Sequence, residues 1–263
     1  MIFLKIGGCE EINFTGGEPL FRQNIFDILE KAKQNKIKVN LLSNGTLINS
    51  RNVKQIKNYV DEIGISLDGA SSEINDAIRG DGSFKKIVNA ISLVKKHKIP
   101  TSLYITICKL NINDFENILR LTKSLNINNV RANEITLRGR AFRNKKILGF
   151  NKSDKSNLEK YLLDILKKIS CQDKDFLFDD SCEIDAKNIF VSPSGYIYPC
   201  IEIYQRKPHC HFGNILKVDK EDFRLQKNQQ VKSKPQSCPY QLIVKDNFAL
   251  CLNKPSTKCN YEC

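Results

Sequence analysis

The chain lacks any apolar run approaching the roughly 20 residues that a membrane-spanning helix requires. Its first residues, MIFLKIGGCEEINF, also lack the basic start, long apolar centre and small-residue cleavage site of a secretory signal peptide. We therefore expect a soluble, cytoplasmic protein with no membrane partner. Its 263 residues suffice for one large domain, or for one domain with a smaller appendix.

The chain also lacks a cluster of lysines and arginines with interleaved aromatic residues, the pattern typical of a nucleic-acid groove, although its net charge is +13. Residues 1–170 hold 29 basic and 17 acidic residues, and the remainder holds 13 and 12, so the excess lies in the first part. A solvated lysine-rich surface explains this spread. The alternative is an electropositive face that attracts an acidic peptide or a nucleotide. We expect no nucleic-acid partner.

Cysteine is concentrated in the last third of the chain. Eight of the ten cysteines follow residue 170: Cys171, Cys182, Cys200, Cys210, Cys238, Cys251, Cys259 and Cys263. In a secreted chain this density indicates disulfides, but in the cytoplasm it favours metal or iron–sulfur ligation. Because turn formers and prolines also replace the earlier periodicity, we place a domain boundary at residue 170, between 1–170 and 171–263.

Before that boundary, strand-like and helix-like patterns alternate. The expected strands are 11–15, 37–46, 62–69, 101–108 and 128–135, and the expected helices are 25–32, 53–60, 84–99, 113–125 and 153–170. This alternation predicts an α/β fold of parallel βαβ units, in an open sheet or a barrel. In either case ligands gather at the carboxyl ends of the strands.

Four polar, glycine-bearing loops follow the expected strands. They are Thr15-Gly-Gly-Glu-Pro19, Ser43-Asn-Gly45, Ser66-Leu-Asp-Gly69 and Arg138-Gly-Arg140. Glycines beside Glu18 leave backbone groups uncovered while the carboxylate can hold an ammonium group, which suggests an amino-acid clamp rather than a simple turn. Ser66 and Asp68 can bond ribose hydroxyls.

The order of INFTGGEPLFR, LLSNGT, ISLDG, IRGDGSF and LRGRA resembles the radical S-adenosylmethionine (radical SAM) enzymes, and specifically the branch that carries a C-terminal SPASM-type auxiliary cluster domain. In that family the GGEP segment holds the methionyl amino group, and polar groups on the fourth strand contact the ribose. The resemblance implies these S-adenosylmethionine ligands, the last two on matching rim loops: Gly16, Gly17, Glu18, Ser66, Asp68, Asn44 and Arg140.

The cysteines after residue 170 carry the rest of the resemblance. Cys182-x12-Gly195-x4-Cys200 is similar to the first half of the SPASM pattern, and Cys238-x12-Cys251-x7-Cys259-x3-Cys263 is a stretched form of the second half. The resemblance implies auxiliary 4Fe-4S clusters, one or two, whose ligands divide into two sets. The first set is Cys182, Cys200 and Cys263, the second is Cys238, Cys251 and Cys259, and Cys210 and Cys171 are candidates to complete them. The alternative is a zinc site with His209 or His211.

The 263 residues contain no Cys-x3-Cys-x2-Cys segment, the motif that binds the SAM-cleaving cluster in the family that this sequence resembles. The expected fold is therefore a partial (β/α) barrel of the radical SAM type without its first βα unit, followed by a small cysteine-rich SPASM-like domain. A late or interrupted coding start, a decayed gene and a functional cluster-less relative all fit this pattern.

The resemblance implies a function as well as a fold. Family members cleave S-adenosylmethionine reductively and abstract hydrogen from a substrate, here expected to be a peptide or protein, with an auxiliary cluster assisting. Without the cleaving cluster we expect this chain to be inactive as it stands. The alternative is a non-catalytic iron–sulfur or zinc protein that binds a peptide partner.

Overall fold

The computed structural model describes residues 9–127, 129–151, 158, 160–162, 164–165, 177–179, 190–198, 209, 214, 240–245 and 248–253. For 177–179, 240–245 and 248–253 only the backbone is described. The chain divides into two compact units, one of residues 11–178 and 242–253, the other of residues 1–10, 179–241 and 254–263. The boundary at residue 170 and the SPASM-like character of residues 171–263 stay predictions.

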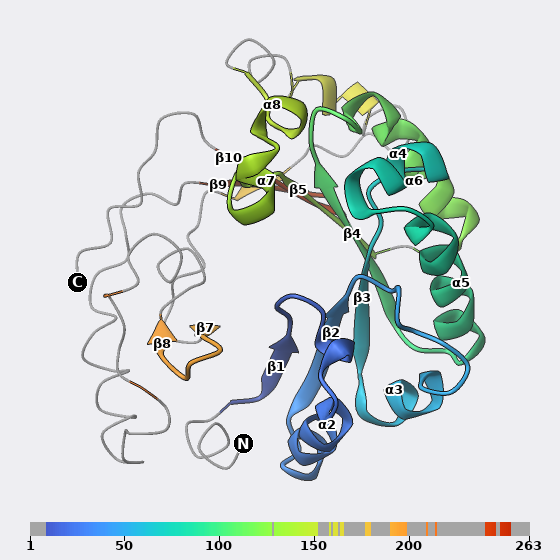
Figure 1. Cartoon of the computed structure of the whole chain (residues 1–263), viewed down its shortest axis with the longest axis vertical. Coiled ribbons are helices and arrows are strands. Elements are labelled where there is room, and N and C mark those ends of the chain that lie inside the picture. Colours follow the sequence, from blue (N-terminus) through green and yellow to red (C-terminus); the bar gives the residue numbers. More distant parts are fainter. Residues whose placement is uncertain are drawn as a thin grey trace. The chain divides into compact units, whose positions relative to one another are not determined.

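Five parallel strands form the centre of the first unit (Figure 1). In sheet order they are β1 (Glu11–Phe14), β2 (Lys38–Ser43), β3 (Glu62–Ser66), β4 (Thr101–Ile107) and β5 (Asn129–Glu134). These strands confirm the predicted α/β fold with a parallel sheet. Beyond β5 the sheet continues with β10 (Phe248–Asn253), which is parallel to β5, then β9 (Tyr240–Lys245) and β6 (Leu177–Asp179). A separate antiparallel pair consists of β7 (Phe190–Val191) and β8 (Ile197–Tyr198).

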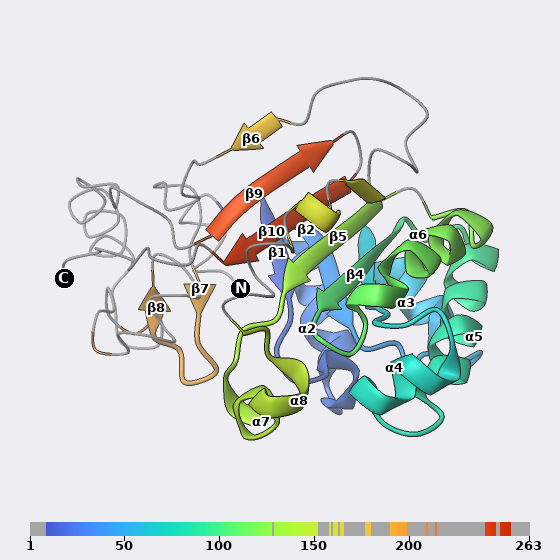
Figure 2. The same cartoon turned by 90° about the horizontal axis from the view of Figure 1, so that it is seen from above.

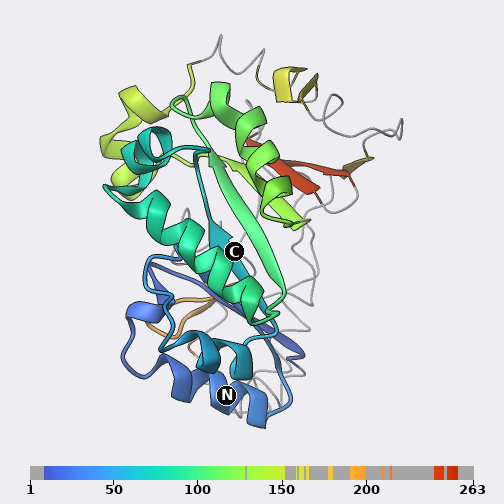
Figure 3. The ribbon, with the colours of Figure 1, turned by 90° about the vertical axis from the view of Figure 1, so that its right-hand side faces the viewer.

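Helices cover one face of the five strands, as Figures 1 and 3 show. These are α2 (Ile25–Gln34), α3 (Val53–Tyr59), α4 (Ser72–Arg79), α5 (Ser83–Lys96) and α6 (Phe115–Ser124). Shorter turns occur at η1 (Pro19–Phe21), η2 (Ile112–Asp114), α7 (Gly139–Arg143) and α8 (Lys145–Leu148). The helix expected at 153–170 lies largely outside the described residues. None of the described helices is long and apolar enough to cross a membrane.

The helix-covered face of the sheet forms the core. On β4, Ile105 and Ile107 are at most 1% exposed and pack with Phe115 and Ile118 from α6. Each such fully buried side chain contributes about 1.5–3 kcal/mol through removal from water. Because strand side chains alternate between faces, every second residue points to the opposite face, which we call the inner face.

The strands are parallel, so their carboxyl ends lie at a single edge of the sheet (Figure 2). The loops that follow β1, β2, β3 and β5 at this edge are the four glycine-bearing loops predicted from the sequence. We call this edge the rim. The fold therefore brings the candidate ligand-binding motifs to one side of the sheet.

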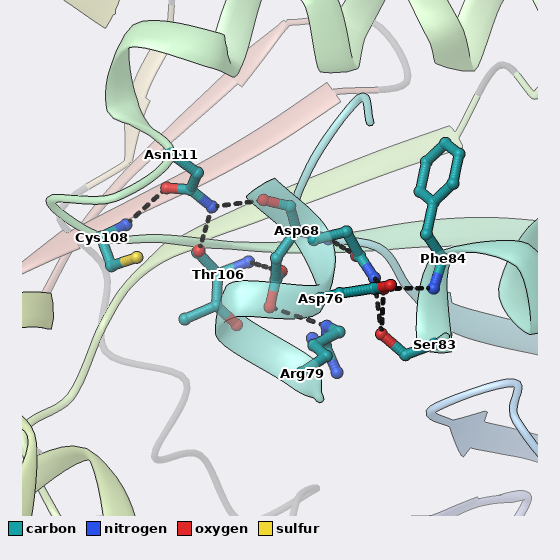
Figure 4. Close-up of polar contacts among 9 residues, drawn as sticks. Asp68, Asp76, Arg79, Ser83, Phe84, Thr106, Cys108 and Asn111 are labelled. Carbon is teal, nitrogen blue, oxygen red and sulfur yellow. Dashed lines mark hydrogen bonds and ion pairs between the residues drawn. The ribbon is translucent and has the colours of Figure 1, made fainter. Parts of the chain in front are cut away.

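Helix α5 begins without a capping side chain of its own, because its N-cap is Gly82, in the left-handed region at φ +71°. Asp76 in α4 caps the helix instead. Its Oδ2 accepts a hydrogen bond from Gly82 N at 2.8 Å. Its Oδ1 accepts hydrogen bonds from Phe84 N at 2.7 Å and from Ser83 Oγ at 2.9 Å (Figure 4). The hydrogen bond from Phe84 N is the main reason that the pKa of Asp76 lies below its ordinary value.

We predict that Asp76→Asn lowers the melting temperature at neutral pH, because one amide oxygen cannot replace two carboxylate oxygens. A lowered native pKa stabilises the fold above the unfolded pKa of about 3.9, and this contribution is lost as the pH falls through the native value. The difference between wild type and variant should therefore shrink below about pH 4, as measured by thermal unfolding across pH. Asp81→Asn, at an exposed position of the same loop, is the control and should change little. An equal effect of the two substitutions would contradict the capping role.

Candidate functional site

The carboxylate of Glu18 links the loop after β1 to the end of β2. Oε1 accepts hydrogen bonds from Leu20 N at 3.1 Å and Ser43 Oγ at 2.9 Å, and Oε2 accepts one from Asn44 N at 2.7 Å. A carboxylate has about four acceptor positions, so one position on Oε2 is left. Glu18 is thus held in place by the protein and retains capacity for one further donor.

The two glycines before Glu18 leave open space at the rim. Gly16 has φ +138°, a conformation that side-chain-bearing residues rarely adopt. A Cβ atom at Gly16 or Gly17 would meet nothing within 4 Å, and both residues are exposed. In the part of the chain that the structure describes, neither glycine carbonyl accepts a hydrogen bond. The loop therefore offers uncovered backbone acceptors beside a fixed carboxylate.

Ser66 ends β3 on the inner face and is half-buried. Its hydroxyl has no hydrogen-bond partner among the described residues, so it is available to a ligand. The predicted residue Asn44 is used differently: its side-chain oxygen accepts from Thr46 N at 2.9 Å and Thr46 Oγ1 at 2.7 Å and braces its own turn, while its backbone N–H holds Glu18. Arg140 lies exposed on α7, after β5.

Asp68 is the most buried of the predicted ligands, with a side chain 3% exposed (Figure 4). Oδ1 accepts a hydrogen bond from Thr106 N at 2.7 Å, and Oδ2 lies 2.7 Å from Arg79 Nε in an ion pair. Burial raises the pKa of the Asp68 carboxyl, while the Arg79 charge and the Thr106 N–H oppose this. The structure thus uses both oxygens to join β3, β4 and α4, and the ribose contact of Asp68 stays a prediction.

Two positioning residues were not predicted. Asn111 donates from Nδ2 to the carbonyls of Asp68 at 2.8 Å and Thr106 at 2.9 Å, and its oxygen accepts from Cys108 N at 2.8 Å (Figure 4). Ser43, 2% exposed, holds Glu18. For Ser43 the sequence holds a usable signal, because this serine is the last strand residue before an Asn-Gly turn. For Asn111 no local sequence pattern indicates the contacts that its side chain makes.

The predicted cluster ligands fall almost entirely outside the described residues. Cys182, Cys200, Cys210, Cys238, Cys259 and Cys263 lie outside the described residues, and Cys251 lies in β10, of which the backbone alone is described. Cys108 is fully buried, as expected of a packing residue, and Cys9 is partly buried. Within the described residues, no group of three or more His, Cys, Asp or Glu side chains could hold a metal ion.

We predict that Arg79→Met destabilises the protein by about 3–5 kcal/mol at pH 7, because it leaves a buried carboxylate without its counter-charge. Loss of Arg79 moves the native pKa of Asp68 further above the unfolded value of about 3.9. The stability lost by the variant relative to wild type should therefore be smaller at pH 4 than at pH 7. Chemical denaturation at both pH values measures this.

Two further variants serve as controls. Adding Asp68→Asn to Arg79→Met should recover part of the lost stability, because the buried charge is then gone. Arg120→Met breaks an exposed pair, Arg120 being 67% exposed beside Glu116, and should cost less than about 1 kcal/mol. A loss for Arg79→Met no larger than for Arg120→Met would contradict the bracing role of the Asp68 pair.

Comparison with known proteins finds similarity in the part of the chain that holds this site. Residues 1–122 match the model of the radical SAM superfamily. The AdoMet-dependent heme synthase of Oleidesulfovibrio alaskensis is 32% identical over 116 residues, which cover 43% of this chain and 30% of that relative. Mycofactocin maturase MftC of Mycolicibacterium smegmatis is 38% identical over 82 residues, which cover 30% of this chain and 21% of the maturase. The matched segments thus span less than a third of these curated relatives.

A solved structure matches a larger part of the fold. Streptococcus suis SuiB bound to S-adenosylmethionine aligns with a TM-score of 0.63 at 14% identity, over 85% of this chain and 56% of SuiB. SuiB has also been solved with its precursor peptide SuiA. At this identity the likeness concerns the fold alone, and it agrees with the parallel sheet and the rim described above. It is also consistent with the radical SAM superfamily model that residues 1–122 match, a little under half of this chain.

Proposed function

We propose that the rim at β1, β2 and β3 binds S-adenosylmethionine and that the protein acts in the modification of a peptide or protein. The observation that carries the proposal is the fixed carboxylate of Glu18 beside an open glycine loop. A primary ammonium group has three donors and needs acceptors that a neutral ligand does not. The rim presents such acceptors without requiring a change in the fold.

The described residues divide the binding task between two strands. The carbonyls of Gly16 and Gly17 and the remaining position on Glu18 Oε2 receive the methionyl ammonium group. Ser66, with its unengaged hydroxyl, bonds a ribose hydroxyl. Asn44 and Asp68 act through their neighbours: Asn44 holds Glu18, and Asp68 fixes the loop after β3. These residues therefore bind and orient the cofactor.

Cleavage of the cofactor needs more than this rim. Bound S-adenosylmethionine, after one-electron reduction by a 4Fe-4S cluster, supplies the hydrogen-abstracting chemistry that gives the superfamily its name. The 263 residues contain no Cys-x3-Cys-x2-Cys motif, and the described cysteines, Cys9 and Cys108, are not part of any such set. The residues present do not fit that cluster, so we propose that they bind S-adenosylmethionine without cleaving it by themselves.

We propose a peptide or protein as the substrate, and auxiliary 4Fe-4S ligation by the cysteines after residue 170. The maturase relative and the SuiB complex with a precursor peptide support a peptide, and the spacing Cys182-x12-Gly195-x4-Cys200 supports the cluster. Metal analysis separates this from a zinc protein, since zinc without acid-labile sulfide would remove the cluster assignment.

We predict that Gly17→Val weakens S-adenosylmethionine binding by about tenfold or more, because the side chain fills the space in front of the loop. The fold should be kept, since a Cβ atom there meets nothing within 4 Å. Equilibrium dialysis with labelled cofactor measures the affinity, and thermal unfolding provides the control. Unchanged affinity in a folded Gly17→Val variant would place the cofactor elsewhere.

We further predict that the anaerobically reconstituted chain, given dithionite and S-adenosylmethionine, forms no more 5′-deoxyadenosine than a protein-free control. The physical reason is the lack of a thiolate set for the cleaving cluster. Chromatography with mass detection measures the product. Its formation would overturn the statement on cleavage and leave the binding proposal standing.

A further inference from the structure

The inner face of the sheet carries charged and polar side chains, and its acidic groups have partners. Glu11 forms an ion pair with Lys38, with 2.9 Å between Oε2 and Nζ. Oε1 of Glu62 accepts hydrogen bonds from Ser102 Oγ and, at 3.3 Å, from Asn129 Nδ2. These two carboxylates therefore bind side chains of neighbouring strands.

Arg131 on the same face differs from them. Among the described residues it forms no ion pair and its guanidinium donates no hydrogen bond. It lies opposite Tyr104 in the β4–β5 register, and its Cζ is 5.8 Å from the centre of the Tyr104 ring. The guanidinium is thus oriented by an aromatic ring while its N–H groups stay available.

Gly64 makes room for that ring. A Cβ atom at Gly64 would lie 2.5 Å from Tyr104 Cε2 and 2.9 Å from Leu42 Cδ1, so the ring lies across the glycine of the neighbouring strand. Burial raises the pKa of the Tyr104 phenol, although the Arg131 cation opposes this, so the ring is neutral at physiological pH. Gly64, Tyr104 and Arg131 therefore form a stacked platform on β3, β4 and β5.

We propose that Arg131, held on this platform, binds a side-chain carboxylate of the peptide substrate. The inference rests on the proposed function for the identity of that substrate. A planar guanidinium with free N–H groups matches a carboxylate in a two-bonded geometry, which a lysine ammonium cannot reproduce. The location agrees: Tyr104 is the register partner of Ser66, so the platform adjoins the residue assigned to the cofactor ribose.

Two blocked pentapeptides, acetyl-AAEAA-amide and acetyl-AAQAA-amide, test this with the full reconstituted chain. They differ in one carboxylate, so the ratio of their dissociation constants, measured by calorimetry, isolates the anion. We expect wild type to favour the glutamate peptide by about fivefold. Arg131→Gln should reduce the ratio to about one, and Arg131→Lys should retain only part of it.

Two variants test the platform apart from the charge. Gly64→Ala should lower the selectivity because its Cβ displaces the ring, whereas Tyr104→Phe keeps the ring and should keep the selectivity. Equal binding of both peptides to wild type, or unchanged selectivity in Arg131→Gln, would overturn the proposal.

Titrations repeated with saturating S-adenosylmethionine show whether Arg131 binds a carboxylate of the substrate or of the cofactor. Selectivity that persists supports a substrate carboxylate. Selectivity that disappears would show that the guanidinium serves the cofactor's own carboxylate, which overturns the substrate assignment. Cofactor binding measured in the same samples reports separately on the proposed function, because its loss with intact peptide selectivity would count against that function alone.

Discussion

The middle of the rim depends on one buried carboxylate. Asp68 receives Thr106 N from β4 and faces Arg79 from α4, so a single side chain fixes the spacing of two strands and a helix. A charge with a side chain 3% exposed is tolerated only when paired and hydrogen-bonded. This requirement links the end of α4 to the loop after β3, and through Asp76 it extends to the start of α5. Ser66 lies two residues earlier, at the end of β3, where the β3–β4 register places it opposite Tyr104.

Glu18 is a second carboxylate that joins two elements of the rim, at a position more accessible to solvent than that of Asp68. It also bridges two elements, but it is only partly buried and keeps an acceptor position on Oε2. The exposed glycines before it give access to that position. The contrast between Asp68 and Glu18 is one of solvent access and not of residue type. It explains why a rim carboxylate is a brace in one loop and a ligand candidate in the next.

The strands β1 to β5 and helices α2, α3, α5 and α6 were predictable because their apolar residues recur with strand or helix periods. Helix α4 was missed because Ser72–Arg79 is short and buries only Asn75 within the helix. The pairing of β10 with β5 joins residues more than 100 positions apart, and no local pattern encodes it. The contact between Tyr104 and Arg131 depends on strand register, which a sequence read element by element does not contain.

The same limit applies to the ligand assignments. Sequence reasoning selected Ser66 and Asp68 together because both follow the same strand and both can bond a hydroxyl. Their hydrogen bonds separate them: the Asp68 oxygens are engaged by Thr106 and Arg79, while the Ser66 hydroxyl is unengaged within the described residues. An engaged buried carboxylate would have to break a charge-assisted contact to bind a ribose, whereas a free hydroxyl gives up only water. The balance of these costs supports the proposal that Ser66 touches the cofactor and that Asp68 positions the loop beside it.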